Sequence, residues 1–427
     1  MGFPHLEGRL GFLALTTINA LCQKWALSDE GLFVAKRPLV AKRLAKIDPH
    51  SVREVFSDAR RVPSIMNLGI GEPDLGPPPH VINAAKRALD EGRTRYSPSV
   101  GVPELSEALV RKAQRDFGLE YDLNEEVLVT VGATEAIFLA LMALINQGDE
   151  VLLLDPGFVC YEPDVLLTGG VAVHVPLLEK DGFRLDADAV MSRITDRSRV
   201  IIINSPNNPT GAVFSYDDLL KLSKLVIERD LIVISDEVYE KIVYDGTRHF
   251  SIATFPGMRE RTISVNSFSK TYAMTGFRVG YALGPADLIN PMARVHQYSV
   301  ACVDGPSQYA AVAALEGSQD CVGAMVAEFD KRRKFMYKRM NEIKGFSCAL
   351  PKGAFYVFIN MRQFKASSAS FADYLIREGK VATISGSAFG EYGEGFLRLS
   401  YATAYEKIAE AMNRIEKAAR GFLGAAK

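Results

Sequence analysis

The chain has 427 residues, of which 48% are hydrophobic and 24% are charged. This is the composition of an ordinary globular protein, and it excludes a disordered, collagenous or disulfide-scaffold chain. Fifty Lys and Arg against 51 Asp and Glu leave a formal net charge of −1, so no overall positive charge favours binding to nucleic acid or to an anionic membrane. A chain of this length is expected to form two or three structural units.

The five cysteines are scattered and none stands in a C-x-x-C pair, which argues against a zinc knuckle or a disulfide framework. Reduced thiols in a cytoplasmic protein are expected instead. The histidines form no H-E-x-x-H motif, and we predict no metal site. Near the start, the apolar run Leu10–Leu21 is too short to span a bilayer of roughly 30 Å. A signal segment is the less favoured alternative to an N-terminal extension over residues 1–35.

Short apolar runs alternate with longer amphipathic stretches from about residue 125 onward. Their β-branched and aliphatic residues are typical of strands buried on both faces. The stretches between them are long enough for helices, as at Glu135–Ile145 and Tyr216–Arg229. This alternation predicts a doubly wound, mostly parallel α/β domain over residues 81–317. The predicted strands are Val127–Val131, Val151–Asp155, Val171–Val175, Val200–Asn204, Leu231–Ser235, Thr262–Asn266 and Val279–Leu283.

After about residue 310 the pattern changes. A long charged helix is expected over Ala324–Lys344, followed by a strand at Ala354–Ile359 and a C-terminal helix whose apolar residues recur every three or four positions. We predict a smaller α+β domain over residues 318–427, completed by residues 36–80. The prolines of EPDLGPPP mark a stiff connector between the two domains.

The segment Ser264–Gly280, SVNSFSKTYAMTGFRVG, carries a lysine just after a predicted strand. In α/β folds, ligands bind at this end of the strands. The hydroxyls of Ser267 and Ser269 and the guanidinium of Arg278 suit a phosphate, and Lys270 beside it suggests a cofactor held as a Schiff base. The alternative is a surface lysine near a salt-bridged arginine.

Two further strand ends carry candidate residues. In DPGFVCY, Phe158 follows a turn and could stack on a planar ring, although a core role is the simpler reading. In NSPNNPTG, Asn208 can present a side-chain donor, and its bond to the following proline is a candidate cis peptide. The alternative for this segment is a plain loop.

The remaining candidates lie in SDEVY and VGATE. Asp236 follows the apolar run LIVIS and should be buried, where a protonated ring nitrogen would be an apt partner. Tyr239 could turn its hydroxyl to the same ligand. Thr134 lies where a helix begins, and helix N-termini bind phosphate. The alternative for Asp236 is that it only caps a helix, and the alternative for VGATE is that it forms an ordinary N-cap. Five strand ends each offer a group suited to one part of a single ligand, and such agreement by chance is improbable.

With these motifs in order, the chain resembles the pyridoxal-phosphate aminotransferases of classes I and II, which have the type I fold of aspartate aminotransferase. The resemblance covers about residues 65–415. Its most specific part is S-F-S-K-T-Y-A-M-T-G-F-R-V-G, which fits the class I lysine signature. The resemblance implies pyridoxal 5′-phosphate as cofactor and a homodimer with shared active sites.

The resemblance also implies residue roles. Lys270 would carry the cofactor and act as general base, Asp236 would pair with the ring nitrogen, and Phe158 would stack on the ring. Asn208 and Tyr239 would bond the 3′ oxygen. Tyr96 would reach the phosphate of the partner subunit, and Gly71 and Arg398 would bind the substrate carboxylate. The phosphate would be bound by Ala133, Thr134, Ser267, Ser269 and Arg278.

The implied reaction moves an amino group from an L-amino acid to a 2-oxo acid, with 2-oxoglutarate as the expected acceptor, by a ping-pong mechanism. A carbon–sulfur β-lyase or a related synthase on the same fold is the alternative. Acidic-substrate relatives often use a second cation for the side-chain carboxylate, but His296–Ser307 holds no Arg or Lys. An aromatic, alanine-type or broad donor range therefore stays open.

Overall fold

The computed structural model describes residues 25–27, 33–35, 39–47 and 64–425. The chain divides into two units, Met1–Asp48 and Pro49–Lys427. In the described part of the first unit, β1 (Trp25–Leu27) pairs antiparallel with β2 (Phe33–Ala35), and a short 3-10 helix covers Lys42–Lys46. The apolar run Leu10–Leu21 and most of the predicted extension lie outside the described residues.

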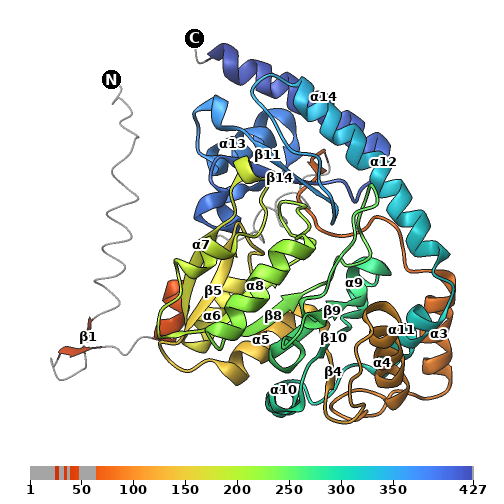
Figure 1. The fold of residues 1–427 in the computed structure, drawn as a ribbon. Coiled ribbons are helices and arrows are strands. Elements are labelled where there is room, and N and C mark those ends of the chain that lie inside the picture. The colour runs from red at the N-terminus through yellow and green to blue at the C-terminus, as the bar shows by residue number, and fades with distance from the viewer. Residues whose placement is uncertain (1–24, 28–32, 36–38, 48–63, 426–427) are drawn as a thin grey trace. The chain divides into compact units, whose positions relative to one another are not determined.

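A seven-stranded sheet forms the centre of the second unit (Figure 1). Its order is β4-β10-β9-β8-β7-β5-β6, and only β10 runs antiparallel to its neighbours. All seven strands coincide with the apolar runs of the sequence, which confirms the prediction of a mostly parallel α/β sheet. The strands are β4 (Val127–Thr130), β5 (Glu150–Asp155), β6 (Val171–Pro176), β7 (Ser198–Asn204), β8 (Ile232–Asp236), β9 (Thr262–Ser267) and β10 (Gly280–Leu283).

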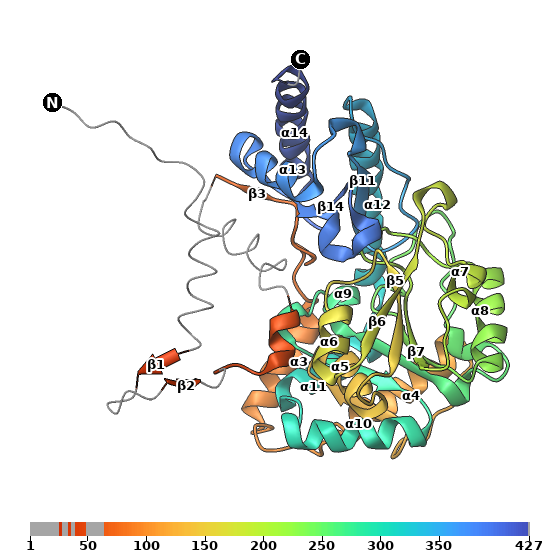
Figure 2. The same cartoon turned by 90° about the vertical axis from the view of Figure 1, so that its left-hand side faces the viewer.

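Helices cover both faces of this sheet, because successive side chains of a strand point to opposite faces. Leu153 packs with α5 (Gly132–Leu144), α6 (Tyr161–Thr168) and α10 (Ala286–Ser299). Leu152 and Leu154 pack on the other side with α7 (Ala187–Met191) and α8 (Tyr216–Glu228). Figure 2 shows α5 and α6 on one side of the strands and α7 and α8 on the other.

A third group of helices packs near β4 and β10. The buried residues Val129 and Tyr281 belong to this cluster together with apolar residues of the helices. The helices of the group are α3 (Pro79–Asp90), α4 (Pro103–Phe117) and α11 (Gly305–Glu316). The short helix α9 (Phe268–Thr271) follows β9 directly, so it begins at the carboxyl edge of the parallel strands.

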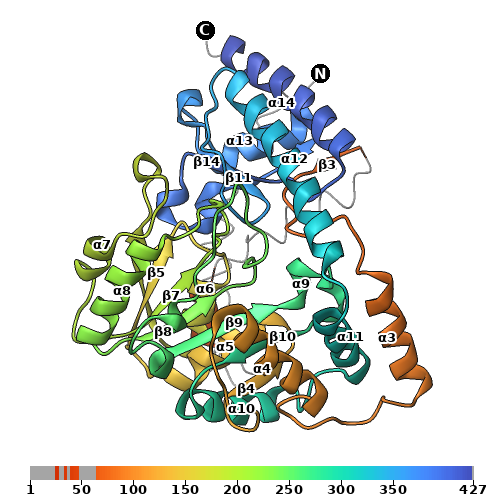
Figure 3. The same cartoon turned by 45° about the vertical axis from the view of Figure 1, so that its right-hand side comes forward.

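The second sheet is antiparallel, in the order β11-β14-β13, with β11 (Tyr356–Asn360), β13 (Ile384–Ser385) and β14 (Phe396–Ser400). Nearby, β3 (Met66–Asn67) pairs with β12 (Val381–Ala382), which joins two distant parts of the chain. The long helices α12 (Asp320–Glu342) and α14 (Tyr405–Ala425) lie side by side (Figure 3). The division into residues 81–317 and residues 36–80 plus 318–427 stays a prediction.

The apolar face predicted for the C-terminal helix is the face that packs. Ile408, Met412, Ile415 and Ala419 are each fully buried, and they share a hydrophobic cluster with β11, β14 and α13 (Ser368–Tyr374). In the part of the chain that the structure describes, no helix is both long enough and apolar enough to cross a membrane.

Candidate active site

The candidate residues gather where the parallel strands end. Phe158 follows β5, Asn208 follows β7, Asp236 ends β8 and Lys270 lies in α9 just after β9. The carboxyl ends of parallel strands meet at one edge of a sheet, where α/β folds place their ligands. The neighbouring order β9-β8-β7-β5 therefore explains why four separate sequence motifs form one site.

Lys270 is partly buried and lies close to the backbone of Gly71. Its Nζ donates a hydrogen bond to Gly71 O at 2.6 Å. Burial lowers the pKa of Lys270 to about 8, and the nearby positive charge of Arg398 acts in the same direction. A larger share of neutral amine is therefore present near pH 8 than on an exposed lysine, which is what a nucleophile or a base requires.

Gly71 is tightly constrained by a tyrosine. A Cβ at this position would lie 2.2 Å from the hydroxyl oxygen of Tyr356, so no larger residue fits without movement. The Tyr356 hydroxyl also forms a 2.9 Å hydrogen bond with the hydroxyl of Tyr239. Burial raises the pKa of Tyr239 well above its ordinary value, so its hydroxyl keeps its proton at neutral pH.

Asp236 is buried and receives two hydrogen bonds. The Tyr161 hydroxyl donates to Asp236 Oδ2 at 2.6 Å, and the Val238 N–H donates to Oδ1 at 3.3 Å. Burial raises the pKa of Asp236 to about 6, against the effect of these two donors. A turn, and no α-helix, follows at residues 238–241, which speaks against the helix-cap alternative. A cationic partner would offset the cost of burying this carboxylate.

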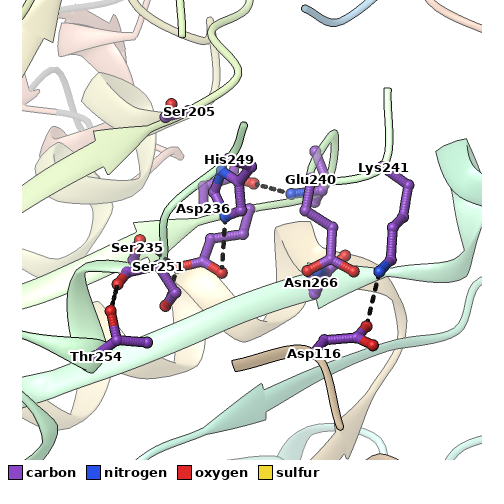
Figure 4. A network of polar contacts seen from close by, with 12 residues as sticks. Asp116, Ser205, Ser235, Asp236, Glu240, Lys241, His249, Ser251, Thr254 and Asn266 are labelled. Atoms are coloured by element: carbon purple, nitrogen blue, oxygen red, sulfur yellow. Dashed lines mark hydrogen bonds and ion pairs between the residues drawn. The ribbon is translucent and has the colours of Figure 1, made fainter. Parts of the chain in front are cut away.

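A buried polar network continues directly beyond Asp236 (Figure 4). The ligand atoms of Glu237, Glu240 and His249 lie within 4.8 Å of one another, an arrangement that could suggest a cation site. Lys112 already supplies the compensating charge, since its Nζ lies 2.6 Å from Glu240. Although burial opposes it, Glu240 raises the pKa of Lys112. We therefore interpret this cluster as a structural ion pair that holds the turn after β8.

Arg398 lies in the middle of β14 and is almost fully buried. It donates to Asn208 Oδ1 at 2.9 Å through Nη1 and to Gly69 O at 2.6 Å through Nη2. Its Nε has no partner among the described residues. Burial lowers the pKa of Arg398 from its ordinary value. A buried guanidinium with a spare donor and no acidic partner is suited to bind the carboxylate of a ligand.

The first turn of α5 meets the guanidinium of Arg278. A Cβ on Gly132 would lie 2.4 Å from Arg278 Nη2, so the glycine leaves room for the arginine. Thr134 is exposed and Ala133 is partly buried. The helix N-terminus and the cation together favour an anion at this place. Arg278 has a left-handed backbone, with φ of 53°.

Two serines, Ser267 at the end of β9 and Ser269 in α9, are buried. Ser267 Oγ donates to Ser269 Oγ at 2.9 Å and lies 3.1 Å from Val279 O. The Ser267 side chain also caps α9 by accepting a hydrogen bond from the Ser269 N–H. Both hydroxyls are held in place without a charged partner, which leaves the Ser269 hydroxyl hydrogen for a further acceptor.

Phe158 and Tyr96 differ in their surroundings. Phe158 is partly buried and lies edge-on to Tyr161, with ring centroids 5.6 Å apart and an interplanar angle of 75°. Tyr96 is 91% exposed and makes no hydrogen bond to the other candidates within residues 64–425. The structure thus brings together all the predicted site residues except Tyr96.

Two residues of this site were not identified from the sequence. Tyr161 contacts Asp236, and Tyr356 contacts Tyr239 and the backbone at Gly71. Tyr161 belongs to the segment DPGFVCY, three positions after Phe158, and that spacing was an available signal. Tyr356 lies in β11, where nothing in the local pattern distinguishes it from a core residue.

The residues present fit pyridoxal phosphate. A lysine with a lowered pKa, a buried carboxylate that lacks a cation, and a helix N-terminus beside an arginine match an aldehyde, a ring nitrogen and a phosphate. The unpartnered Nε of Arg398 adds a donor for a substrate carboxylate. The first three features follow strands β9, β8 and β4 of the seven-stranded sheet, so one bound cofactor can engage them together, and Arg398 reaches the site from β14 of the second sheet.

Comparison with known proteins agrees with this geometry. The family described as "Aminotransferase class I and II" matches residues 63–415. An aspartate aminotransferase of Pyrococcus abyssi is 45% identical over 383 residues, which are 89% of this chain and 98% of the relative. Aromatic-amino-acid aminotransferase 2 of Thermococcus litoralis is 44% identical over 380 residues, 88% of this chain and 97% of the relative.

A solved structure described as Pyrococcus protein-A1 superposes with a TM-score of 0.86 at 46% identity, covering 88% of this chain and 97% of that one. Fold, sequence and site geometry agree over most of the chain. The chain therefore belongs to the class I and II aminotransferases, the enzymes that transfer amino groups with pyridoxal phosphate as cofactor.

Proposed function

We propose that this aminotransferase accepts L-amino acids with a range of side chains, aromatic ones included, and passes their amino group to 2-oxoglutarate. The observation that carries the proposal is the buried Arg398, which holds Asn208 and Gly69 and keeps an unpartnered Nε. A guanidinium recognises the carboxylate that all amino acids and 2-oxo acids share. This contact does not depend on the substrate side chain, so the rest of the pocket determines which amino acids are accepted as donors.

The proposed cofactor contacts follow the predicted roles. Bound pyridoxal phosphate supplies an electron-withdrawing ring that stabilises negative charge on the substrate Cα. Asp236 would hold a proton on the ring nitrogen, and Tyr161 would orient Asp236. Phe158 would lie against the ring, and Asn208 and Tyr239 would bind its phenolic oxygen. The phosphate would be bound by Ala133, Thr134, Ser267, Ser269 and Arg278.

Lys270 is the proposed base at the reacting carbon. Its Nζ lies 2.6 Å from Gly71 O. Gly69, two residues earlier in the chain, accepts a hydrogen bond from Arg398 through its carbonyl oxygen. One short backbone segment therefore binds both Lys270 and Arg398, which we call the carboxylate clamp because it is proposed to bind the substrate carboxylate. Once its amine is free, Lys270 would take the proton from the substrate Cα and return it at the neighbouring carbon.

The donor range is supported by two observations. Relatives at 45% and 44% identity carry the names aspartate aminotransferase and aromatic-amino-acid aminotransferase 2. His296–Ser307 has no Arg or Lys, so this segment offers no cation to a dicarboxylic substrate. Strict specificity for aspartate would need a cation from another part of the protein. A broad range with aromatic donors is therefore the better proposal.

The test is a panel of L-amino acids with 2-oxoglutarate, followed by the absorbance change from the pyridoxal to the pyridoxamine form of the cofactor. We expect several donors to react, including phenylalanine or tyrosine. Reaction with aspartate alone would contradict the proposed range. Release of pyruvate and ammonia without an oxo acid would instead favour a carbon–sulfur β-lyase, an alternative that the comparisons do not support.

We also propose a homodimer with shared active sites. The exposed ring of Tyr96, at 91%, supports a role outside its own subunit, and symmetric dimers are the commonest oligomers. A Lys270→Ala chain mixed with a Tyr96→Phe chain should regain activity, because one mixed site collects both defects and the other has none. The Tyr96→Phe parent must first be weak enough to reveal the gain. A fully active monomer would contradict the proposal.

A cytoplasmic location and a role in amino acid biosynthesis complete the proposal. The first is supported by scattered cysteines without disulfide spacing, and the second by a reaction that forms amino acids from 2-oxo acids. Fractionation of the source cells, with the transamination assay on each fraction, tests the location. Recovery of the activity outside the cytoplasmic fraction would refute it.

A further inference from the structure

Asp155, the last residue of β5, binds a backbone segment that is far away in the sequence. The Glu391 N–H donates to Asp155 Oδ2 at 2.9 Å, and the Tyr392 N–H donates to Oδ1 at 3.2 Å. The Asp155 side chain is 1% exposed. Both carboxylate oxygens are therefore engaged by a turn that precedes β14.

The approach of the two segments requires a glycine. Gly390 has φ of 120°, and a Cβ on it would lie 2.2 Å from Asp155 Oδ1. One residue earlier, Phe389 O accepts a 2.8 Å hydrogen bond from the Gly157 N–H. Three backbone contacts and one close approach thus hold residues 389–392 against the end of β5.

His174 on β6 provides the counter-charge of Asp155. Its Nδ1 lies 3.0 Å from Asp155 Oδ2, and its Nε2 lies 3.8 Å from Glu162. The hydrogen bond to Asp155 raises the pKa of His174 to about 10, so the imidazole is protonated at neutral pH. A charged partner strengthens the hydrogen bonds of the carboxylate and stabilises it inside the protein.

The segment held in this way carries an aromatic ring of the substrate site. Phe389 is 3% exposed, and its ring centroid lies 4.8 Å from Arg398 Cζ. The ring of Tyr356 lies 4.4 Å from the same atom. The guanidinium is thus packed by aromatic rings, and displacement of either ring would alter the direction of its free donor.

We propose that Asp155 is a positioning residue for the substrate carboxylate. By binding the backbone of Glu391 and Tyr392, it seats Phe389 against Arg398 and so orients the guanidinium. The inference rests on the proposed role of Arg398 as the carboxylate clamp. It adds that binding of both substrates depends on a contact between the end of β5 and the turn before β14.

The first test is Asp155→Asn, which keeps the shape of the side chain. The amide retains one acceptor and turns an NH₂ group toward a backbone N–H, so one of the two contacts is lost. We expect KM to rise about 10- to 100-fold for both the amino acid and the oxo acid. The absorbance of the bound cofactor should persist, and kcat should change by less than about threefold.

Gly390→Ala adds a Cβ that would push residues 389–392 away from Asp155, and it changes no charge. It should reproduce the rise in KM if the contact matters, and it serves as the second variant where Asp155→Asn fails to fold. Glu162→Gln is the matched control, because it removes a nearby charge but leaves the backbone contacts in place. We expect parental KM values from this control. An unchanged KM in a folded, cofactor-loaded Asp155→Asn or Gly390→Ala would overturn the proposal.

Arg398→Lys separates this inference from the function on which it rests. If Arg398 is the clamp and Asp155 acts through it, adding Asp155→Asn to Arg398→Lys should raise KM by less than about threefold further. Full additivity of the two effects would overturn the inference and leave the clamp intact. A parental KM for Arg398→Lys itself would refute the clamp. Reaction with an amine that lacks a carboxylate should be insensitive to all these changes.

Discussion

The hydroxyl of Tyr161 donates a 2.6 Å hydrogen bond to Asp236 Oδ2, and both side chains are buried. Tyr161 begins α6 and Asp236 ends β8, so the bond links a helix to a strand on the site edge of the sheet. Phe158 packs edge-on against the same tyrosine. Tyr161 therefore holds the Asp236 carboxylate and also packs against Phe158, the residue expected to stack on the cofactor ring.

Removing this hydroxyl should slow catalysis. Tyr161→Phe deletes a hydrogen bond to a charged group, which is worth about 1.5–3 kcal/mol, and leaves Asp236 with the longer hydrogen bond from the Val238 N–H. We expect kcat/KM to fall by about 10- to 100-fold, with a shift in the cofactor's absorbance titration. The control is Tyr401→Phe, since the Tyr401 hydroxyl bonds Ala354 O, away from Asp236. Equal kinetics of the two variants would show that the Tyr161 hydroxyl is only structural.

The pH dependence of cofactor attachment should report on Lys270. Because its pKa is lowered to about 8, mainly by burial, its amine changes from mostly charged at pH 7 to mostly neutral at pH 9. The rate of pyridoxal phosphate attachment to the cofactor-free protein should rise over this interval and then level off. A rate that still rises steeply above pH 9 would indicate an ordinary lysine. Borohydride reduction followed by mass spectrometry should locate the label on Lys270, and Lys270→Ala should remain unlabelled.

Replacement of Arg398 should affect every amino acid substrate. Arg398→Lys keeps the charge but loses the fork of donors, so kcat/KM should fall by about 30- to 1,000-fold for all of them. The cofactor spectrum should persist, because the phosphate-binding candidates lie elsewhere. Arg362→Lys is a matched control on the neighbouring surface, where the guanidinium pairs with Glu179. Loss of activity with only some amino acids would argue against a common clamp.

His174 should stabilise the fold in a pH-dependent way. Its pKa is raised to about 10 by the hydrogen bond to Asp155, against about 6.5 in an unfolded chain. The stabilisation is complete below about pH 6.5, where both states are protonated, and it is lost as the pH rises toward 10. The difference in Tm between the parent and His174→Gln should therefore be largest near pH 6 and shrink by pH 10. A constant difference would show that packing, and not charge, is responsible.

The sequence alone determined the strands and the order of the chemical groups. Buried strands are continuous apolar runs, so all seven could be located from residue type alone, and four of the candidates lie at or just after a strand end. Lys270, Asp236, Asn208 and Phe158 could be nominated because neighbouring parallel strands bring such ends together. The apolar spacing of Ile408 and Met412 likewise predicted a helix face before any contact was known.

The tertiary structure decided which side chains touch. Tyr161 meets Asp236 across 75 positions and Asp155 meets Glu391 across 236, and no local pattern encodes such distances. Gly390 looks like an ordinary loop glycine until Asp155 is found where its Cβ would be, and only the structure shows that Tyr356 occupies that place at Gly71. The physical reason is that periodicity reports burial along one element, whereas hydrogen bonds and close approaches depend on how separate elements pack.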